Sequence, residues 1–320
     1  MLLEPTSSGI YCSQGDFYID PVSPVSRAII THAHTDHARP GMKSYLTSVS
    51  GEPLVRARVG MRASIEPLSF GTQIMIGDVK VSLHPAGHIL GSAQVRVEHN
   101  GEVWVVSGDY KLEPDPTCEP FEPVPCHTFI TESTFGRPNY KWKPQREIFN
   151  RMNDWWSMNK TWGMASLVGA YSLGKAQRVL AGLDPEIGPI YIYPTIETYL
   201  PAYRRAGVTF PQLQLFEPER VHEIVNEGAL IVAPPNIRTL FTGIEASKIS
   251  TGFASGWMSR GGKHSTVYDI GFPLSDHADW NGLLHAIEAT GAARVFAMHG
   301  FTKTLTEHLR TLGYEAHEWH

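Results

Sequence analysis

The chain has 320 residues, of which 42% are hydrophobic, and its formal net charge at pH 7 is −5. This length and apolar content are sufficient for a large packed core, which excludes a disordered chain. The net charge excludes an overall basic surface, so any positive potential must be local or supplied by bound metal.

Short apolar runs separated by Gly, Pro and Asp predict a strand-rich region over the first 140 residues. The expected strands cover residues 27–31, 79–83, 93–98, 103–106 and 128–131. Several runs lead directly into a polar cluster, for example into His32, into Asp109 and into Glu132. We therefore expect reactive side chains to gather at one edge of the sheets.

The pattern changes after about Pro138. Helical spacing predicts a helix over residues 144–160, followed by a buried strand at 164–170 and a helix from Lys175 that Ser172 caps. Further strand and helix patterns cover residues 189–193, 199–205 and 230–233. From about Gly271 the first pattern returns, with a helix near 283–289, a strand at 294–298 and a last helix ending near Gly313. We predict one domain formed by residues 1–140 and 271–320, with residues 141–270 inserted as a second domain.

One short segment contains three histidines and an aspartate: His32, His34, Asp36 and His37. In an extended segment His32 and His34 share a face, because side chains alternate with a period of two. A turn at Thr35 would bring Asp36 and His37 to a second position beside them. Imidazole and carboxylate groups are ligands for zinc, manganese or iron, and the lack of nearby cysteine favours an open catalytic site.

Four further residues each lie at the end of an apolar run: His88, Asp109, His277 and His299. A single residue of this kind is more often a loop residue that hydrogen-bonds its neighbours. Together with the preceding segment, however, the set predicts a metal centre. The other nine histidines have no comparable placement, and we expect surface or packing roles for them.

At these residues the chain resembles the metallo-β-lactamase superfamily and, more closely, its β-CASP nucleases, over essentially its whole length. The superfamily motifs occur in family order at Asp20, residues 32–37, His88 and Asp109. The β-CASP motifs occur at Glu132, His277 and His299, and residues 171–177 resemble a turn of RNA-cleaving members. The resemblance implies an α/β fold: a metallo-β-lactamase αββα sandwich with an inserted β-CASP αβ domain and the active site in the cleft between them.

The resemblance also implies roles for these residues. One metal ion would be held by His32, His34 and His88, the other by Asp36, His37 and His299, with Asp109 bridging both. The pair of divalent ions, zinc or manganese, would activate water and clamp a phosphodiester. Asp20 would orient a ligand from outside the ligand shell, and His277, paired with Glu132, would protonate the leaving oxygen. The alternative is that Glu132 and His277 form a structural pair at the domain junction.

Within the β-CASP branch, residues 110–118, 252–258 and 274–280 are most similar to bacterial ligase-associated DNA exonucleases. This likeness implies a DNA exonuclease, acting on single-stranded DNA in DNA repair, with a DNA ligase and a helicase as functional partners. His299 favours a rival function, because DNA crosslink-repair members typically lack this histidine and RNA-processing members have it. An RNA-processing endonuclease or exonuclease, a non-nucleolytic metallo-hydrolase and an inactive scaffold subunit are the alternatives.

Substrate contacts are expected in the inserted region. Ser172, Gly174 and Lys175 lie where a helix N-terminus would present N–H groups to a phosphate, and Arg260 and Lys263 would add positive charge. The competing interpretation is a helix cap with ordinary solvated cations. We predict that Trp257 stacks on an unpaired base, and that the apolar periodicity of Trp155, Trp156 and Trp162 places these three in the core instead.

The sequence also carries an expectation about location. Residues 1–11 lack a basic region followed by an apolar run, and no stretch of about 18 residues is unbroken apolar sequence. Cys12, Cys118 and Cys126 form neither a CxxC pair nor an even disulfide framework. We therefore expect a cytoplasmic protein without a membrane partner.

Overall fold

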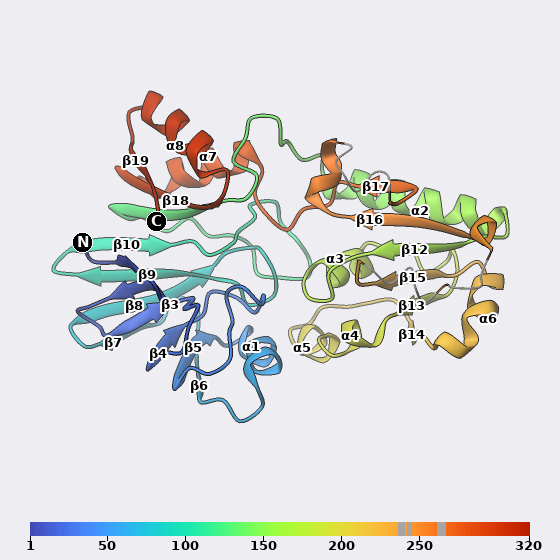
Figure 1. The fold of residues 1–320 in the computed structure, drawn as a ribbon, viewed down its shortest axis with the longest axis horizontal. Helices are drawn as coiled ribbons and strands as arrows, with labels where there is room; N and C mark the ends of the chain where they lie inside the picture. The colour runs from blue at the N-terminus through green and yellow to red at the C-terminus, as the bar shows by residue number, and fades with distance from the viewer. Residues whose placement is uncertain (236–240, 242–244, 261–266) are drawn as a thin grey trace. The chain divides into compact units, whose positions relative to one another are not determined.

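The computed structural model divides the chain into two compact units, shown as a ribbon in Figure 1. Unit 1 consists of residues 1–141 and 277–320, and unit 2 of residues 142–276. The structure describes residues 1–235, 241, 245–260 and 267–320. Mixed α/β structure, as the sequence predicts, is present in both units.

Unit 1 contains two sheets. The first has the strand order β1 to β6 and consists of β1 (Glu4–Thr6), β2 (Gly9–Cys12), β3 (Phe17–Ile19), β4 (Arg27–Ile29), β5 (Ser44–Ser48) and β6 (Ile65–Leu68). The second has the order β19-β18-β11-β10-β9-β8-β7 and consists of β7 (Gln73–Ile76), β8 (Val79–Pro85), β9 (Ala93–His99), β10 (Glu102–Val106), β11 (Thr128–Ser133), β18 (Arg294–Gly300) and β19 (Glu315–Glu318). The helices of this unit are α1 (Glu52–Val59), α7 (Trp280–Thr290) and α8 (Thr302–Thr311).

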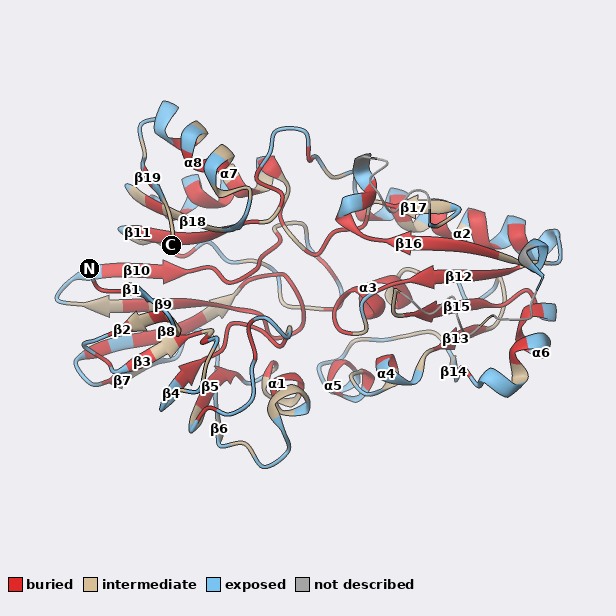
Figure 2. Ribbon diagram, in the orientation of Figure 1, coloured by how far each residue is buried: buried red, intermediate tan, exposed pale blue. Residues whose placement is uncertain are grey.

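The two sheets of unit 1 pack face to face. A fully buried core joins Phe17, Ile19 and Ile29 of the first sheet to alternate residues of the second, such as Val95 and Val97. The opposite face of the second sheet buries a separate apolar cluster against α7 and α8. Because side chains alternate along a strand, β10 and β11 supply both cores: Trp104 and Ile130 lie in the first, Val105 and Phe129 in the second. In Figure 2 both strands are largely coloured as buried.

This topology collects polar residues at one edge of each sheet. In the first sheet β3 and β4 run parallel, so their carboxyl ends meet, and Asp20 and His32 lie just beyond these ends. In the second sheet β10, β11 and β18 are parallel neighbours, and their carboxyl ends carry Asp109, Glu132 and His299. The strand-end clusters of the sequence are therefore neighbours in space.

Unit 2 is built on a parallel sheet with the order β14-β13-β15-β12-β16-β17. Its strands are β12 (Ala165–Gly169), β13 (Ile190–Ile192), β14 (Leu213–Leu215), β15 (Leu230–Ala233), β16 (Ile249–Ala254) and β17 (Ile270–Phe272). Its helices are α2 (Gln145–Thr161), α3 (Lys175–Ala181), α4 (Pro194–Glu197), α5 (Leu200–Arg205) and α6 (Val221–Asn226), with 3-10 turns at η1 (Pro218–Arg220), η3 (Ala246–Lys248) and η4 (Gly256–Arg260). Apolar clusters cover both faces of the sheet, as a parallel sheet requires.

Most expected helices and strands are present, with one error in the predicted core. Trp155 and Trp156 are buried in α2, whereas Trp162 lies just past the end of this helix with 64% of its surface exposed. The helix ends at Thr161, so the helical periodicity that placed Trp162 in the core no longer applies there. Among the described residues, no helix combines the length and the hydropathy needed to cross a lipid bilayer.

Replacing Gly300 with alanine is expected to reduce the free energy of unfolding by more than about 2 kcal/mol. Gly300 ends β18 with a φ of +76°, and a Cβ there would overlap the backbone of Ser133 and Thr134. Gly291 is the matched control, because its φ is +66° but a Cβ would meet nothing within 4 Å. Urea denaturation should give a loss near 1 kcal/mol for Gly291→Ala; equal losses for both variants would contradict the steric argument.

Candidate metal centre and catalytic pair

Three imidazoles of unit 1 point their nitrogens at one spot. His34 Nδ1 lies 3.1 Å from His32 Nε2 and 3.0 Å from His88 Nε2. Asp109 Oδ2 completes the group at 3.6 Å from His32 Nε2 and 3.8 Å from His88 Nε2. His32 and His88 are fully buried, and Asp109 is nearly so.

These four atoms fit a metal ion of tetrahedral preference. Each of the four residues offers one ligand atom, and the four atoms all lie within 4.8 Å of one another. Ligand atoms around a tetrahedral zinc ion are about 3.4 Å apart, given metal–nitrogen and metal–oxygen distances near 2.1 Å. The His/Asp cluster therefore could bind a metal ion.

The same oxygen of Asp109 faces a second group. His37 Nε2 lies 3.6 Å from Asp109 Oδ2 and 3.8 Å from Asp36 Oδ2. The ring of His299 is 5.5 Å from the ring of His37, measured between centroids. Asp36 and His299 are solvent-exposed, so this side of the cluster is open, whereas the side of His32 and His88 is closed.

A turn explains how one short segment supplies both groups. The carbonyl oxygen of His34 accepts hydrogen bonds from the backbone N–H groups of His37 and Ala38, at 3.2 and 2.8 Å. This reversal of the chain brings the ring of His37 next to the ring of His32, with 4.1 Å between their centroids. The expected change of direction between His34 and His37 is therefore present.

Asp20 supports the cluster from outside. Its carboxylate accepts hydrogen bonds from Thr31 N at 2.8 Å and from Thr31 Oγ1 at 2.5 Å, and its Oδ2 lies 2.7 Å from His37 Nδ1. With Nδ1 held in this way, Nε2 of His37 is turned toward Asp109. The φ of Asp20 is +46°, a left-handed conformation that its contacts with Thr31 and His37 hold in place.

Burial and neighbouring charges shift the pKa values of His32, His37 and Asp109. Burial keeps the pKa of His32 well below its usual value, so its imidazole is neutral and able to coordinate. Burial would also lower the pKa of His37, but the carboxylates of Asp109 and Asp20 outweigh this effect and raise it to about 10. Burial would raise the pKa of Asp109, yet His37 and His277 hold it below its usual range. The carboxylate of Asp109 is thus kept ionised.

Replacing Asp20 with asparagine is expected to weaken metal binding about 10- to 100-fold without unfolding unit 1. The amide retains the shape of the side chain but loses the negative charge beside His37 Nδ1. Metal content after dialysis against graded chelator would measure the effect, with the exposed Asp16→Asn as control. An unchanged affinity would show that Asp20 does not orient His37.

Glu132 and His277 form a pair next to the cluster. His277 Nδ1 lies 2.9 Å from Glu132 Oε2 and 3.1 Å from Oε1. Glu132 is 1% exposed, and its Oε1 also accepts a 2.7 Å hydrogen bond from Tyr110 N. His277 retains some exposure, and its ring centroid is 4.7 Å from that of His88. A partly exposed imidazole is therefore held beside the metal centre by a buried carboxylate.

A competing geometry involves the same pair. Donor atoms of Asp109, Glu132 and His277 also lie within 4.8 Å of one another, which is close enough for a metal ion. His277 Nδ1 is 4.0 Å from Asp109 Oδ2 but 2.9 Å from Glu132. The short contact favours a hydrogen-bonded pair, and metal content can distinguish the two arrangements.

The expected phosphate contacts of unit 2 are arranged differently from the prediction. Lys175 is 3% exposed, forms an ion pair with Asp276 and donates a 2.7 Å hydrogen bond to Leu274 O. Its ammonium is therefore held inside unit 2, while the predicted contact of a phosphate with the N–H groups of this helix N-terminus stays a prediction. Gly174, not Ser172, is the N-cap of α3, and Gln177 Oε1 accepts the hydrogen bond of Gly174 N.

The remaining candidates differ in how far the structure describes them. Ser172 is partly exposed and its Oγ lies 2.8 Å from Thr195 Oγ1. Trp257 in η4 is 41% exposed, as a stacking residue requires. Arg260 ends η4, but its side chain, like the whole of Lys263, is outside the described residues.

Two residues of the site carry no signal in the sequence. Thr31 fixes Asp20, and its Oγ1 also lies 3.1 Å from His32 Nδ1. Tyr110 contributes only its backbone N–H, to Glu132. A hydroxyl at a strand end and a backbone amide are too common to single out without coordinates.

Comparison with known proteins supports the family resemblance. No known family model matches the chain. The chain is 32% identical to a probable DNA ligase of Opitutus terrae over 97% of its own length and 30% of that protein. It is 31% identical to the endoribonuclease ysh-1 of Neurospora crassa over 38% of its own length and 14% of that protein. The chain thus spans a third or less of the length of these curated relatives.

A solved structure extends the likeness to the fold. A protein of unknown function from Enterococcus faecalis covers 91% of this chain with a TM-score of 0.64 at 10% identity, and the match covers 78% of that protein. At this identity the match concerns the fold alone. The endoribonuclease relative supports the resemblance to β-CASP nucleases that the sequence motifs carry.

Proposed function

We propose that the chain is a two-metal phosphodiesterase, and specifically an exonuclease of single-stranded DNA. The observation that carries the proposal is the position of Asp109 Oδ2, which lies 3.6–3.8 Å from nitrogens of two separate ligand groups. One carboxylate oxygen facing both groups is the arrangement that two adjacent metal ions need. Bound there, a pair of divalent ions would supply a nucleophilic water near neutral pH and offset the charge of a phosphodiester.

The ligands divide into two sets in this proposal. His32, His34 and His88 would hold one ion, and Asp36, His37 and His299 would hold the other, with Asp109 available to both. Zinc and manganese both suit imidazole and carboxylate ligands. His32 and His88 of the first set are buried, whereas Asp36 and His299 of the second set are exposed to solvent. A substrate would therefore approach from the side of Asp36 and His299.

The chain's own acid would be His277. Glu132 engages Nδ1 and so leaves Nε2 to carry the proton that passes to the leaving oxygen. The buried carboxylate also stabilises the charged imidazolium until the transfer occurs. This role explains why a fully buried glutamate is paired with a partly exposed histidine.

DNA is the preferred substrate in this proposal, because the relative that matches over almost the whole chain is named a probable DNA ligase. The same match supports a DNA ligase as functional partner in DNA repair; the helicase partner and the cytoplasmic location stay predictions. An RNA-processing nuclease is the second candidate. It is supported by the endoribonuclease relative and by His299, which lies beside His37.

The proposed architecture follows the same family. We assign unit 1 to the metallo-β-lactamase sandwich and unit 2 to the inserted β-CASP domain. Two sheets packed face to face, with helices on the outer face of the second sheet, support the first assignment. A continuous segment of 135 residues that is bounded on both sides by unit 1 supports the second.

Degradation of end-labelled strands tests the function. Metal-stripped protein, re-supplied with manganese or zinc, is given single-stranded DNA and RNA of the same sequence. We expect metal-dependent release of mononucleotides or short oligomers from DNA. Cleavage of RNA alone would favour the second candidate, and intact strands of both kinds in metal-loaded protein would leave a non-nucleolytic hydrolase or an inactive scaffold.

A further inference from the structure

A pocket of about 210 Å³ within unit 1 opens directly beside the second ligand set. Asp36, His37 and His299 form part of its lining, and Asp20 lies in the same wall. The rest of the lining is mostly apolar, from residues of β2, β3, β10 and β18 and from Val22 and Trp319: Ile10, Ile19, Val22, Val106, Met298 and Trp319. Thr6 and His320 also line it, so the pocket is a mainly apolar recess whose wall includes the second ligand set.

Trp319 is the aromatic part of the wall, and it is held firmly. Its backbone N–H donates a 2.9 Å hydrogen bond to Ala297 O, next to β19. Its ring packs edge to face on Phe296, with 5.2 Å between the ring centroids. A fixed indole ring beside aliphatic side chains provides a surface on which a flat ring can stack at little entropic cost.

We propose that this recess, which we call the base pocket, holds the base of the nucleotide whose phosphate lies at the metal centre. The inference rests on the proposed nuclease function. The pocket shares three residues with the second ligand set, so a base inside it is adjacent to the phosphate of the same nucleotide.

The volume determines what the base pocket accepts. A dry cavity of about 150 Å³ already binds benzene. About 210 Å³ therefore has room for one nucleobase but not for a base pair. The substrate at this site is an unpaired nucleotide, and the apolar walls make its recognition tolerant of sequence.

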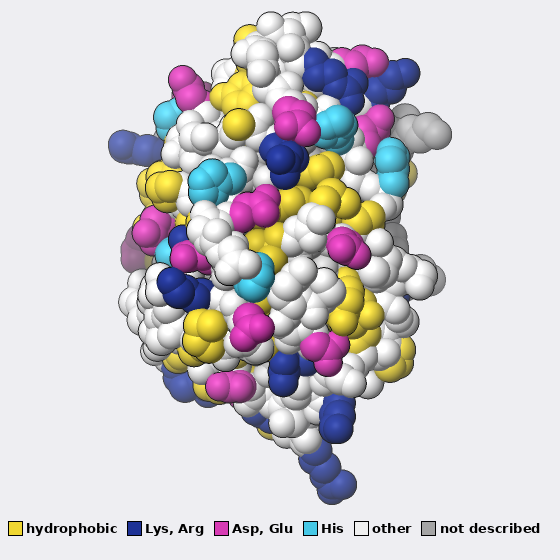
Figure 3. All heavy atoms as spheres, turned by 90° about the vertical axis from the view of Figure 1, so that its left-hand side faces the viewer, with side chains coloured by type: hydrophobic (Ala, Val, Ile, Leu, Met, Phe, Trp, Pro, Cys, Tyr) yellow, Lys and Arg dark blue, Asp and Glu magenta, His cyan; other side chains and the backbone are white. Residues whose placement is uncertain are grey.

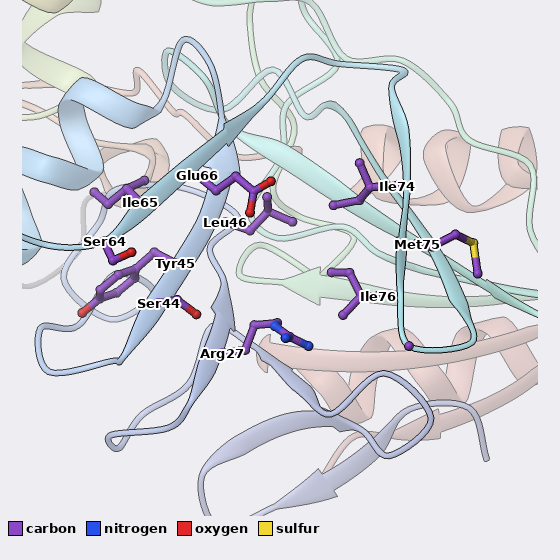
Figure 4. Close-up of a pocket in the computed structure, with 11 residues that line it drawn as sticks. Arg27, Ser44, Tyr45, Leu46, Ser64, Ile65, Glu66, Ile74, Met75 and Ile76 are labelled. Atoms are coloured by element: carbon purple, nitrogen blue, oxygen red, sulfur yellow. The ribbon is translucent and has the colours of Figure 1, made fainter.

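A larger pocket on the same unit provides a comparison. It has about 370 Å³ and lies between β5, β6 and β7, with Leu46, Ile74 and Ile76 among its walls (Figure 4). It shares no residue with the ligand sets. Size alone would therefore favour the other pocket. We choose the base pocket because His37 and His299 form part of its wall.

Calorimetry tests the base pocket without relying on turnover. Metal-loaded protein is titrated with a deoxynucleoside 5′-monophosphate and with deoxyribose 5′-phosphate, which lacks the base. We expect about tenfold tighter binding of the nucleotide to the unmodified chain, as stacking of a base predicts. Equal affinity for the two ligands would overturn the proposal.

Two variants test whether the preference for the nucleotide over the sugar phosphate arises in the base pocket. Val22→Trp fills the recess from a position that is 45% exposed, and Trp319→Leu removes the stacking surface. Both should abolish the preference for the nucleotide and leave the affinity for the sugar phosphate unchanged. Met75→Trp makes the same kind of change in the pocket of Figure 4, at a residue that is 59% exposed, and should retain the full preference. Because Trp319→Leu also loses its contact with Phe296, Val22→Trp is the decisive variant: retention of the preference there would overturn the proposal.

An abasic substrate separates this inference from the proposed function. If the chain degrades normal single-stranded DNA about tenfold faster than a strand with an abasic terminal nucleotide, both stand. If it degrades the two equally fast, the nuclease function stands and the base pocket is wrong. If it cleaves neither, the nuclease function fails, and the calorimetric preference still decides whether the pocket binds a base.

Discussion

Replacing Asp109 with alanine is expected to remove metal binding and phosphodiesterase activity together, with a loss of about a thousandfold or more in kcat/KM. Asp109 is the residue whose single oxygen faces both ligand groups, so neither group is complete without it. The change also leaves His37 without the carboxylate that most strongly raises its pKa. The His37 pKa would fall, which leaves the ring neutral, but Nε2 would lose the carboxylate that it faces at 3.6 Å, and a reoriented ring would hinder binding of the second ion.

Metal analysis after gel filtration, together with cleavage of end-labelled DNA, would measure both losses in one preparation. Asp154→Ala is the matched control, because Asp154 is an exposed carboxylate on α2 of unit 2. The variant should retain the metal and the activity of the unmodified chain. Two bound ions per chain in Asp109→Ala would refute the bridging role.

The clustering of the candidate ligands could be predicted from the sequence for a local reason. His32, His34 and His37 are close in the sequence, and a short turn is sufficient to bring them together. Asp109 follows β10 and His299 lies at the end of β18, and both strands are parallel neighbours of β11, so their positions at the same sheet edge depend only on strand direction. Local sequence patterns of this kind can be recognised without knowledge of the tertiary structure.

Features that depend on distant contacts could not be predicted in the same way. The sequence gives no sign that the Lys175 side chain is buried, because its ion-pair partner Asp276 lies about a hundred residues later. The strands β1 and β14 have three residues each, too few for alternation to be recognised. The base pocket combines residues from both ends of the chain, which no local pattern links.

The distribution of charged side chains on the surface shows why net charge alone does not identify a nucleic-acid-binding protein. On the face shown in Figure 3, lysines and arginines are scattered among acidic side chains and do not form one large basic patch. The net charge of −5 is consistent with this mixture. A nucleic acid that approaches this face would meet no large basic patch, so metal ions bound beside Asp36 and Asp109 would supply local positive charge.

Replacing His277 with alanine is expected to lower kcat by about 10²- to 10⁴-fold while leaving metal content unchanged. The ring of His277 is bound to Glu132 through Nδ1 at 2.9 Å, so its removal should not open either ligand set. Glu132→Gln should reproduce a smaller part of the loss, because the amide still contacts the ring but no longer stabilises the imidazolium. The exposed His285→Ala on α7 is the control for loss of a histidine.

Substrates with different leaving groups can distinguish whether His277 acts as a general acid or as a metal ligand. A nitrophenyl phosphodiester releases a phenolate that needs no proton, so a general acid contributes little to its cleavage. If His277 is the acid, His277→Ala should cleave this ester almost as fast as the unmodified chain, although it degrades DNA slowly. If His277 instead holds a metal ion with Asp109 and Glu132, as their spacing also permits, the variant should lose metal and cleave both substrates equally poorly. The first pattern is expected because the contact to Glu132 is 2.9 Å and that to Asp109 is 4.0 Å, which marks a hydrogen-bonded pair.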